Sequence, residues 1–107
     1  MSVERIRELN DQFRRTYDGG KVMMTSGINA LSASVKFRIL EKVRAFDAFS
    51  PENDPHHEHD FGSFEEGGHK VFFKVDYYDA AMEFGSDDPA DPSKTTRVLT
   101  IMLAREY

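Results

Sequence analysis

Residues 53–62, with the sequence NDPHHEHDFG, bring three histidines and three carboxylates together within ten positions. If the chain is extended beyond the Asn-Asp-Pro turn signal, its side chains alternate between two faces, so that His57 and His59 share one side. Two imidazoles at this spacing lie on Cα atoms about 7 Å apart and can bind one metal ion. The spacing therefore predicts an open site for a zinc- or manganese-type ion. The third ligand would come from elsewhere in the chain, from His69, Asp76 or Asp79.

The same segment also has a purely structural interpretation. Histidines and acids in a turn are usually solvated, and ion pairs between them at the surface contribute little stability. Asp60, directly before Phe61 and Gly62, would then accept hydrogen bonds from backbone N–H groups in a tight turn. On this interpretation, which we favour, we expect no cofactor, whereas a divalent metal belongs to the first interpretation alone.

Residues 76–79, with the sequence Asp-Tyr-Tyr-Asp, form a second candidate group. Carboxylates that flank phenols can act as acid and base. The alternative, which we favour, is that the tyrosine rings anchor a sheet while Asp79 caps the next turn. Arg97 is the candidate for a two-pronged clamp on the carboxylate of Asp76 or Asp60. The candidate catalytic residues are thus Glu58, Asp60, Asp76 and Arg97.

Four acidic side chains follow within residues 83–91. Such a run can simply keep a loop solvated. It can also present charges at a phosphate-like spacing to a basic groove on a partner protein, as inhibitors that mimic DNA do. The candidate partner-binding residues are Glu83, Asp87, Asp88 and Asp91.

Charge is divided unequally along the 107 residues. Residues 1–50 carry nine Lys and Arg against six acids, whereas residues 51–107 carry five against thirteen. This division argues against a generally basic nucleic-acid binder but leaves room for a local basic patch, and Lys36, Arg38, Lys42 and Arg44 form one. Direct nucleic-acid binding is therefore the less favoured alternative.

Several classes of protein are excluded by composition. The chain has no cysteine, so it forms no disulfide and has no thiol nucleophile. Its charged first residues do not resemble a secretory signal, and no apolar run reaches the roughly 18 residues that a membrane helix needs. We expect one cytoplasmic domain over residues 1–107 without membrane contact.

Hydrophobic periodicity predicts two helices, over residues 3–17 and 34–46, the second with Phe37 in the core. Strands are predicted over residues 21–25, 61–66, 69–78 and 95–106, the middle two as a hairpin around Gly67 and Gly68. Between them we expect a helical turn over 80–84 and a loop over 85–94. The fold class is α+β, with two helices packed on an antiparallel sheet of about four to five strands as a two-layer sandwich.

Six ordered motifs resemble one known family: LNDQFR, TSG, NDPHHEHDFG, VDYYD, SDDPADP and TTRVLTIMLAREY. The family consists of small bacterial proteins of unknown function, common in alphaproteobacteria and often carried on plasmids and other mobile elements. The resemblance covers nearly the whole chain, although Phe73 stands where the family leads us to expect tryptophan. It implies a compact bacterial protein with an accessory role, such as modulating a host defence or replication complex.

Two hypotheses about function follow from these observations. The first is a non-enzymatic module that binds another protein or a protein–nucleic-acid complex, because no complete catalytic constellation is present and the second half is acidic. The second is a small metal-dependent hydrolase that uses His57, His59, Asp60 and Asp76.

Overall fold

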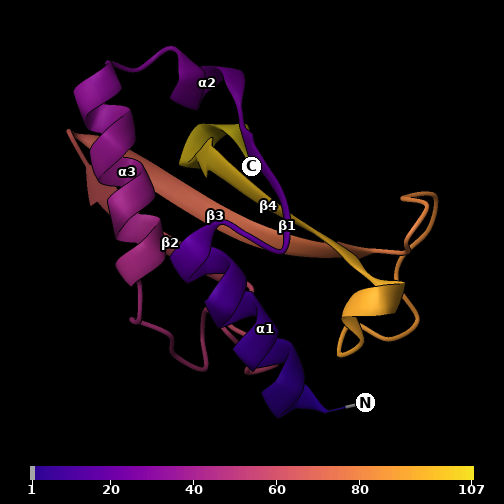
Figure 1. Cartoon of the computed structure of the whole chain (residues 1–107). Helices are drawn as coiled ribbons and strands as arrows, with labels where there is room; N and C mark the ends of the chain where they lie inside the picture. The colour runs from indigo at the N-terminus through magenta and orange to yellow at the C-terminus, as the bar shows by residue number, and fades with distance from the viewer. Residues whose placement is uncertain (1) are drawn as a thin grey trace.

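The sheet is built around the hairpin that the sequence predicts. The computed structural model describes residues 2–107 and places four strands in the order β1-β4-β3-β2 (Figure 1). Their bounds are β1 Gly20–Met24, β2 Phe61–Glu66, β3 His69–Tyr78 and β4 Thr96–Leu103. The β2–β3 turn consists of Gly67 and Gly68, whose φ angles of 59° and 81° suit a residue without Cβ.

The sheet is mixed, so the prediction of an antiparallel sheet is wrong for one strand pair. β3 runs antiparallel to β2 and β4, but β1 pairs with β4 in parallel. The parallel pairing joins strands that are far apart in the chain, and this length allows the connection to cross over. β4 lies between β1 and β3, as expected for a strand with apolar residues on both faces.

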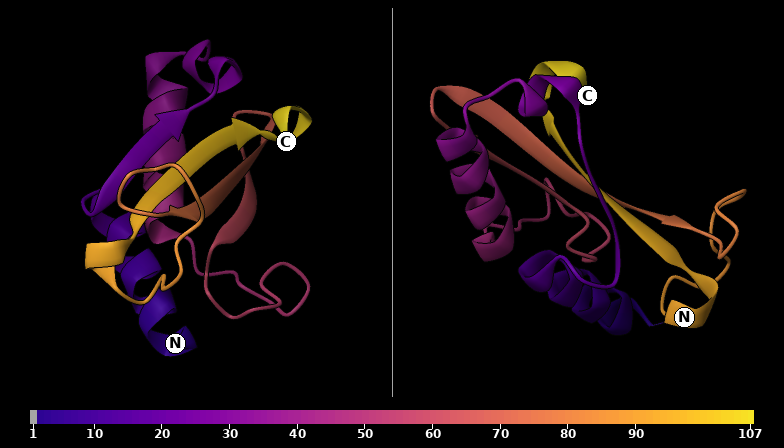
Figure 2. Two further views of the ribbon diagram at one scale, coloured as in Figure 1. Left: turned by 90° about the vertical axis from the view of Figure 1, so that its right-hand side faces the viewer. Right: turned by 45° about the horizontal axis from the view of Figure 1, so that its top comes forward.

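Two longer helices lie on one face of the sheet, and a short third helix connects β1 to the second of them (Figure 2). They are α1 Val3–Thr16, α2 Ser26–Asn29 and α3 Ala33–Ala45, of which α2 was not predicted. The core between helices and sheet includes Phe13, Val43 and Phe73. None of the helices within residues 2–107 is long and apolar enough to span a bilayer.

The expectation that Phe37 lies in the core is wrong, because its side chain is 63% exposed. The buried residues of α3 are Ile39 and Val43. At 100° per residue, Phe37 points about 160° away from Ile39 around the helix, which places its ring in solvent.

The chain between β3 and β4 also differs from expectation. Residues 80–84 form a tight loop instead of a helical turn, because Met82 has a φ of 58° and Tyr78 makes an isolated bridge to Gly85. A short 3-10 helix, Pro92–Lys94, precedes β4. The predicted last strand ends at Leu103, and residues Ala104–Glu106 form another 3-10 turn. We call residues 79–95 the acidic loop; it lies on the opposite side of the molecule from α3 (Figure 1).

Candidate functional site

Residues 51–60, here called the histidine turn, are not extended. His57 and His59 have φ angles of 60° and 56°, in the left-handed region, so the predicted alternation of side chains is wrong. Asp54 holds this conformation from within, since its buried Oδ1 accepts from the backbone N–H of Glu58 at 3.0 Å and of His59 at 3.2 Å. These bonds offset the cost of two left-handed non-glycine residues.

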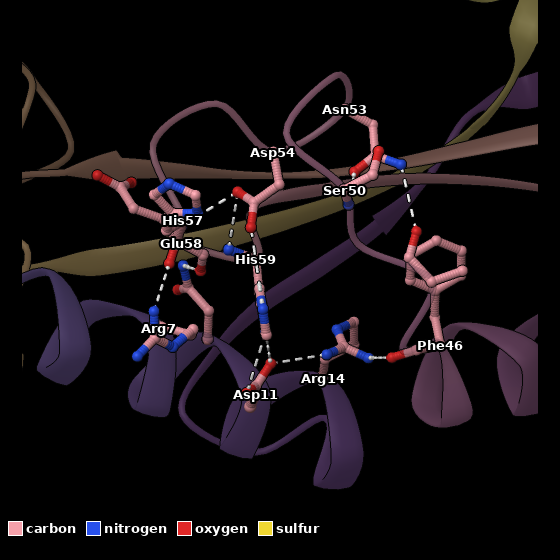
Figure 3. A network of polar contacts seen from close by, with 12 residues as sticks. Arg7, Asp11, Arg14, Phe46, Ser50, Asn53, Asp54, His57, Glu58 and His59 are labelled. Atoms are coloured by element: carbon pink, nitrogen blue, oxygen red, sulfur yellow. Dashed lines mark hydrogen bonds and ion pairs between the residues drawn. The ribbon is translucent and has the colours of Figure 1, made fainter.

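His59 fastens the histidine turn to α1 (Figure 3). Its Nδ1 lies 2.9 Å from Oδ1 of Asp11, and its ring stacks on Phe49 with centroids 3.8 Å apart. The same Asp11 oxygen accepts from Arg14 at 2.8 Å, and Arg14 in turn donates to the carbonyl of Phe46 just beyond α3. A continuous chain of polar contacts therefore joins the turn to both long helices.

The histidine turn borders a pocket of about 140 Å³ that includes His57, His59, Asp54 and Ser50. An imidazole that a carboxylate orients through one ring nitrogen can accept a proton at the other nitrogen. In His59 that other nitrogen, Nε2, lies 3.8 Å from Oδ2 of a second carboxylate, that of Asp54. Within residues 2–107 no group of three or more histidine or carboxylate side chains is arranged to hold a metal ion.

The candidate third metal ligands lie elsewhere in the fold. Asp76 pairs with Lys74 at 3.0 Å, and Oδ1 of Asp79 accepts from the backbone N–H of Glu83 at 3.0 Å. His69 begins β3 beside the hairpin turn. The structure thus brings His57 and His59 to one pocket without any of these three residues.

A second network is centred on Tyr77, on the core side of β3. Its hydroxyl donates to Oε1 of Glu58 at 2.7 Å and accepts from Nδ2 of Asn10 at 2.7 Å. Asn10 also donates to the backbone oxygen of Glu58 at 3.0 Å. Burial raises the pKa of Tyr77, and Glu58 raises it further, so the phenol keeps its proton and remains a donor.

Arg97 joins the Tyr77 network through Asn10 and not through a carboxylate. Its Nε donates to Oδ1 of Asn10 at 2.8 Å, an Nη donates to the carbonyl of Pro89, and the guanidinium lies 5.3 Å from the centre of the Tyr77 ring. The predicted clamp on Asp76 or Asp60 is therefore wrong. An amide and a carbonyl take the place of the expected acid.

Asp60 stands apart from both networks. Its backbone oxygen accepts from the N–H of Val75 at 2.9 Å, which aligns the end of the histidine turn with β3. Burial raises the pKa of its carboxyl group, and the charge of Glu58 raises it further. Of the four candidate catalytic residues, Glu58 and Arg97 are linked through Asn10, whereas Asp60 and Asp76 are separate.

Some carboxylates of the acidic loop accept hydrogen bonds within its turns, and others are exposed to solvent. Asp88 accepts from the N–H of Ala90, and Asp91 caps the 3-10 helix by accepting from Ser93. Glu83 and Asp87 are exposed. Phe84, which lies between them in the chain, is 71% exposed, and Met82, directly before Glu83, is 37% exposed. Large apolar side chains thus stand among free charges at the tip of the loop.

Several of these residues escaped the sequence analysis, namely Asn10, Asp11, Asp54 and Phe84. One signal was available, because Asn10 occupies the same stripe of α1 as Ile6 and Phe13 at spacings of four and three. A polar residue on a buried stripe requires a buried hydrogen-bond partner. Nothing comparable marked Phe84, whose exposure depends on the path of the loop.

Comparison with known proteins gives one match. The model of a family described as "Protein of unknown function (DUF3768)" matches residues 24–106. No curated protein and no solved structure matches the chain.

Proposed function

We propose that this chain, which belongs to the DUF3768 family of proteins of unknown function, is a small cytoplasmic, non-enzymatic module that binds a basic partner protein through its acidic loop. The observation that carries the proposal is the tip of the loop, where exposed Phe84 and Met82 stand beside Glu83 and Asp87. Aromatic and methionine side chains are enriched at protein interfaces, and surrounding charges select a partner of opposite sign.

The shape of the loop supports this proposal. Asp79 N–H donates to the carbonyl of Phe84 at 2.7 Å, and Ser86 N–H donates to the carbonyl of Tyr77 at 3.1 Å, so the tip is held at its base. A held loop loses little conformational entropy when it binds. We place the partner in a defence or nucleic-acid-processing complex of the host, because proteins of such complexes carry basic surfaces.

The hydrolase alternative receives less support. Its four residues lie in separate places, as His57 and His59 line one pocket while Asp76 pairs with Lys74. Asp60 neither lines this pocket nor pairs with Lys74. A hydrolase would need the base, the metal ligands and a place for water to converge.

Capture experiments with matched variants test the proposal. The labelled chain is cross-linked in a lysate of its source organism and the bound protein is quantified, for the wild type, Phe84→Ser and Phe37→Ser. Both phenylalanines are exposed, so neither change should affect the thermal midpoint. We expect Phe84→Ser to reduce capture at least about tenfold and Phe37→Ser to leave it unchanged.

The dependence of capture on salt concentration is the second measurement. Capture by the wild type should weaken as ionic strength rises, because the charges of Glu83 and Asp87 are exposed and therefore screened. Equal losses in both phenylalanine variants, or capture that is indifferent to salt, would contradict binding through the acidic loop.

A second candidate function, contact of nucleic acid with α3, is favoured by the exposed ring of Phe37 beside Lys36 and Arg38. An exposed aromatic ring next to cations can stack on a base. Its support is reduced because Arg38 and Lys42 both pair with Glu66, at 3.0 and 3.2 Å. Retention on single-stranded DNA that is lost in Phe37→Ser and kept in Phe84→Ser would establish it.

A further inference from the structure

Arg97 is a buried cation without a carboxylate partner. The residue is 3% exposed, and within residues 2–107 its guanidinium makes hydrogen bonds to two neutral oxygens, those of Asn10 and Pro89. The nearest acid of its network, Glu58, is already bound by the hydroxyl of Tyr77. A buried charge is costly unless an opposite charge meets it, and arginine cannot lose its proton to avoid this cost.

The nitrogen of this guanidinium that makes no hydrogen bond within the described chain is Nη1, while Nη2 keeps a second N–H beside the one that it donates to Pro89. Nη1 is also not fully buried. Solvent therefore reaches Nη1. Arg97 also lines a pocket of about 120 Å³ between α1 and the end of the acidic loop.

The surroundings of this pocket are suited to an anion of a particular kind. Leu9, Phe13 and Pro92 give it apolar walls, and Gln12 adds an amide. Burial lowers the pKa of Arg97 and the positive charge of Arg5 lowers it further, whereas the negative charge of Glu58 raises it, so that a second cation and an acid both act on this guanidinium. The pocket is smaller than the roughly 300 Å³ of typical ligand sites, so it holds a small molecule or a single group.

We propose that this pocket binds the carboxylate of a small monocarboxylic acid, with Nη1 of Arg97 as the donor and the apolar walls around the acid's short carbon chain. This site is separate from the tip of the acidic loop. A monoanion fits better than phosphate for two reasons. Only Nη1 of Arg97 has both of its N–H groups without a partner within the described chain, and the carboxylate of Asp18, which also lines the pocket, repels a doubly charged ligand more strongly.

Titration of the ¹⁵N-labelled full chain with butyrate tests the proposal, with butyramide as the uncharged isostere and inorganic phosphate as the competing anion. We expect butyrate to cause saturable shifts of the Arg97 Nε–H signal and of the Gln12 and Gly19 amides at millimolar concentration. Butyramide should leave these signals unchanged, and phosphate should bind more weakly. Equal shifts with butyramide, tighter binding of phosphate or shifts away from the pocket would overturn the proposal.

Variants of exposed residues give a second test that does not disturb the core. Asp18→Asn should tighten butyrate binding about two- to fivefold, and Arg5→Gln should weaken it by a similar factor. Asp47→Asn and Arg15→Gln are the matched controls, since both residues are exposed and neither lines the pocket. An unchanged affinity in both Asp18→Asn and Arg5→Gln would also refute the site.

Discussion

The hydroxyl of Tyr77 connects the histidine turn to α1 and β3, and its removal tests this role directly. Tyr77→Phe keeps the half-buried ring and its contact with Arg97 but deletes two hydrogen bonds of 2.7 Å, one to Glu58 and one from Asn10. The first has a charged acceptor and contributes about 1.5–3 kcal/mol, and the second contributes about 0.5–1.5 kcal/mol. We therefore expect the free energy of unfolding to fall by about 2–4 kcal/mol.

Urea denaturation at neutral pH measures this loss, and thermal unfolding should show a midpoint about 10–25 °C lower. Tyr78→Phe is the matched control. Tyr78 is the next residue of β3, faces the other side of the sheet and makes no side-chain hydrogen bond within residues 2–107. Its change should stay within about 0.5 kcal/mol.

A double-mutant cycle separates the two bonds. If the contact with Glu58 is the larger, Tyr77→Phe and Glu58→Ala together should cost at least about 1 kcal/mol less than the sum of the single changes. A loss below about 0.5 kcal/mol in Tyr77→Phe, or equal losses in Tyr77→Phe and Tyr78→Phe, would refute the argument that this hydroxyl holds the turn.

Two further predictions concern the sheet and the C-terminus. Gly62→Ala should destabilise the fold by about 1–3 kcal/mol, because a Cβ at this position would overlap the ring of Phe73. Gly85→Ala is the control: its Cβ would meet only a carbonyl oxygen at 3.9 Å, so the urea midpoint should change little. Glu106→Gln should lower stability at neutral pH, because Glu106 accepts from Thr25 at 2.6 Å and from two backbone N–H groups, and these bonds, that of Thr25 foremost, hold its pKa below the usual range. A carboxyl group with a lowered pKa stabilises the fold at pH values above its unfolded-state pKa, and this contribution is lost as pH falls through its folded-state pKa. The difference in free energy of unfolding between the wild type and Glu106→Gln should therefore shrink below about pH 4.3. A difference that stays constant down to acid pH would contradict this role.

The parts of the fold that were predictable depend on local signals. The hairpin followed from alternation on either side of Gly67 and Gly68, and α1 followed from its apolar stripe. Both signals lie within a few residues of the feature that they specify. The parallel pairing of β1 with β4 has no such signal, because the residues that pair are far apart in the sequence, for example Gly20 with Arg97 and Val22 with Leu99.

The candidate site was less predictable, because its geometry depends on contacts between distant residues. Alternation failed in the histidine turn since Asp54 holds His57 and His59 in left-handed conformations, and Asp11 binds His59 from 48 positions away. The sequence marked the segment as unusual, but the bonds from backbone N–H groups that it assigned to Asp60 are made by Asp54. It could not indicate that an amide, Asn10, and not an acid, would bind Arg97.

Arg97 links the two surfaces to which we assign binding. One of its Nη atoms donates to the carbonyl of Pro89, within the acidic loop, and Arg97 also lines the pocket to which we assign the carboxylate. Its Nε binds Asn10 and thereby the Tyr77 network. A ligand that binds Arg97 in the pocket would contact the same side chain that donates to the carbonyl of Pro89 in the loop. Any coupling between the two sites through Arg97 would be reciprocal, so that a partner bound at the loop and a ligand bound in the pocket would change each other's affinity by the same factor. The buried charge is therefore best understood as the connection between the loop and the core, and its lack of a carboxylate leaves that connection open to a ligand.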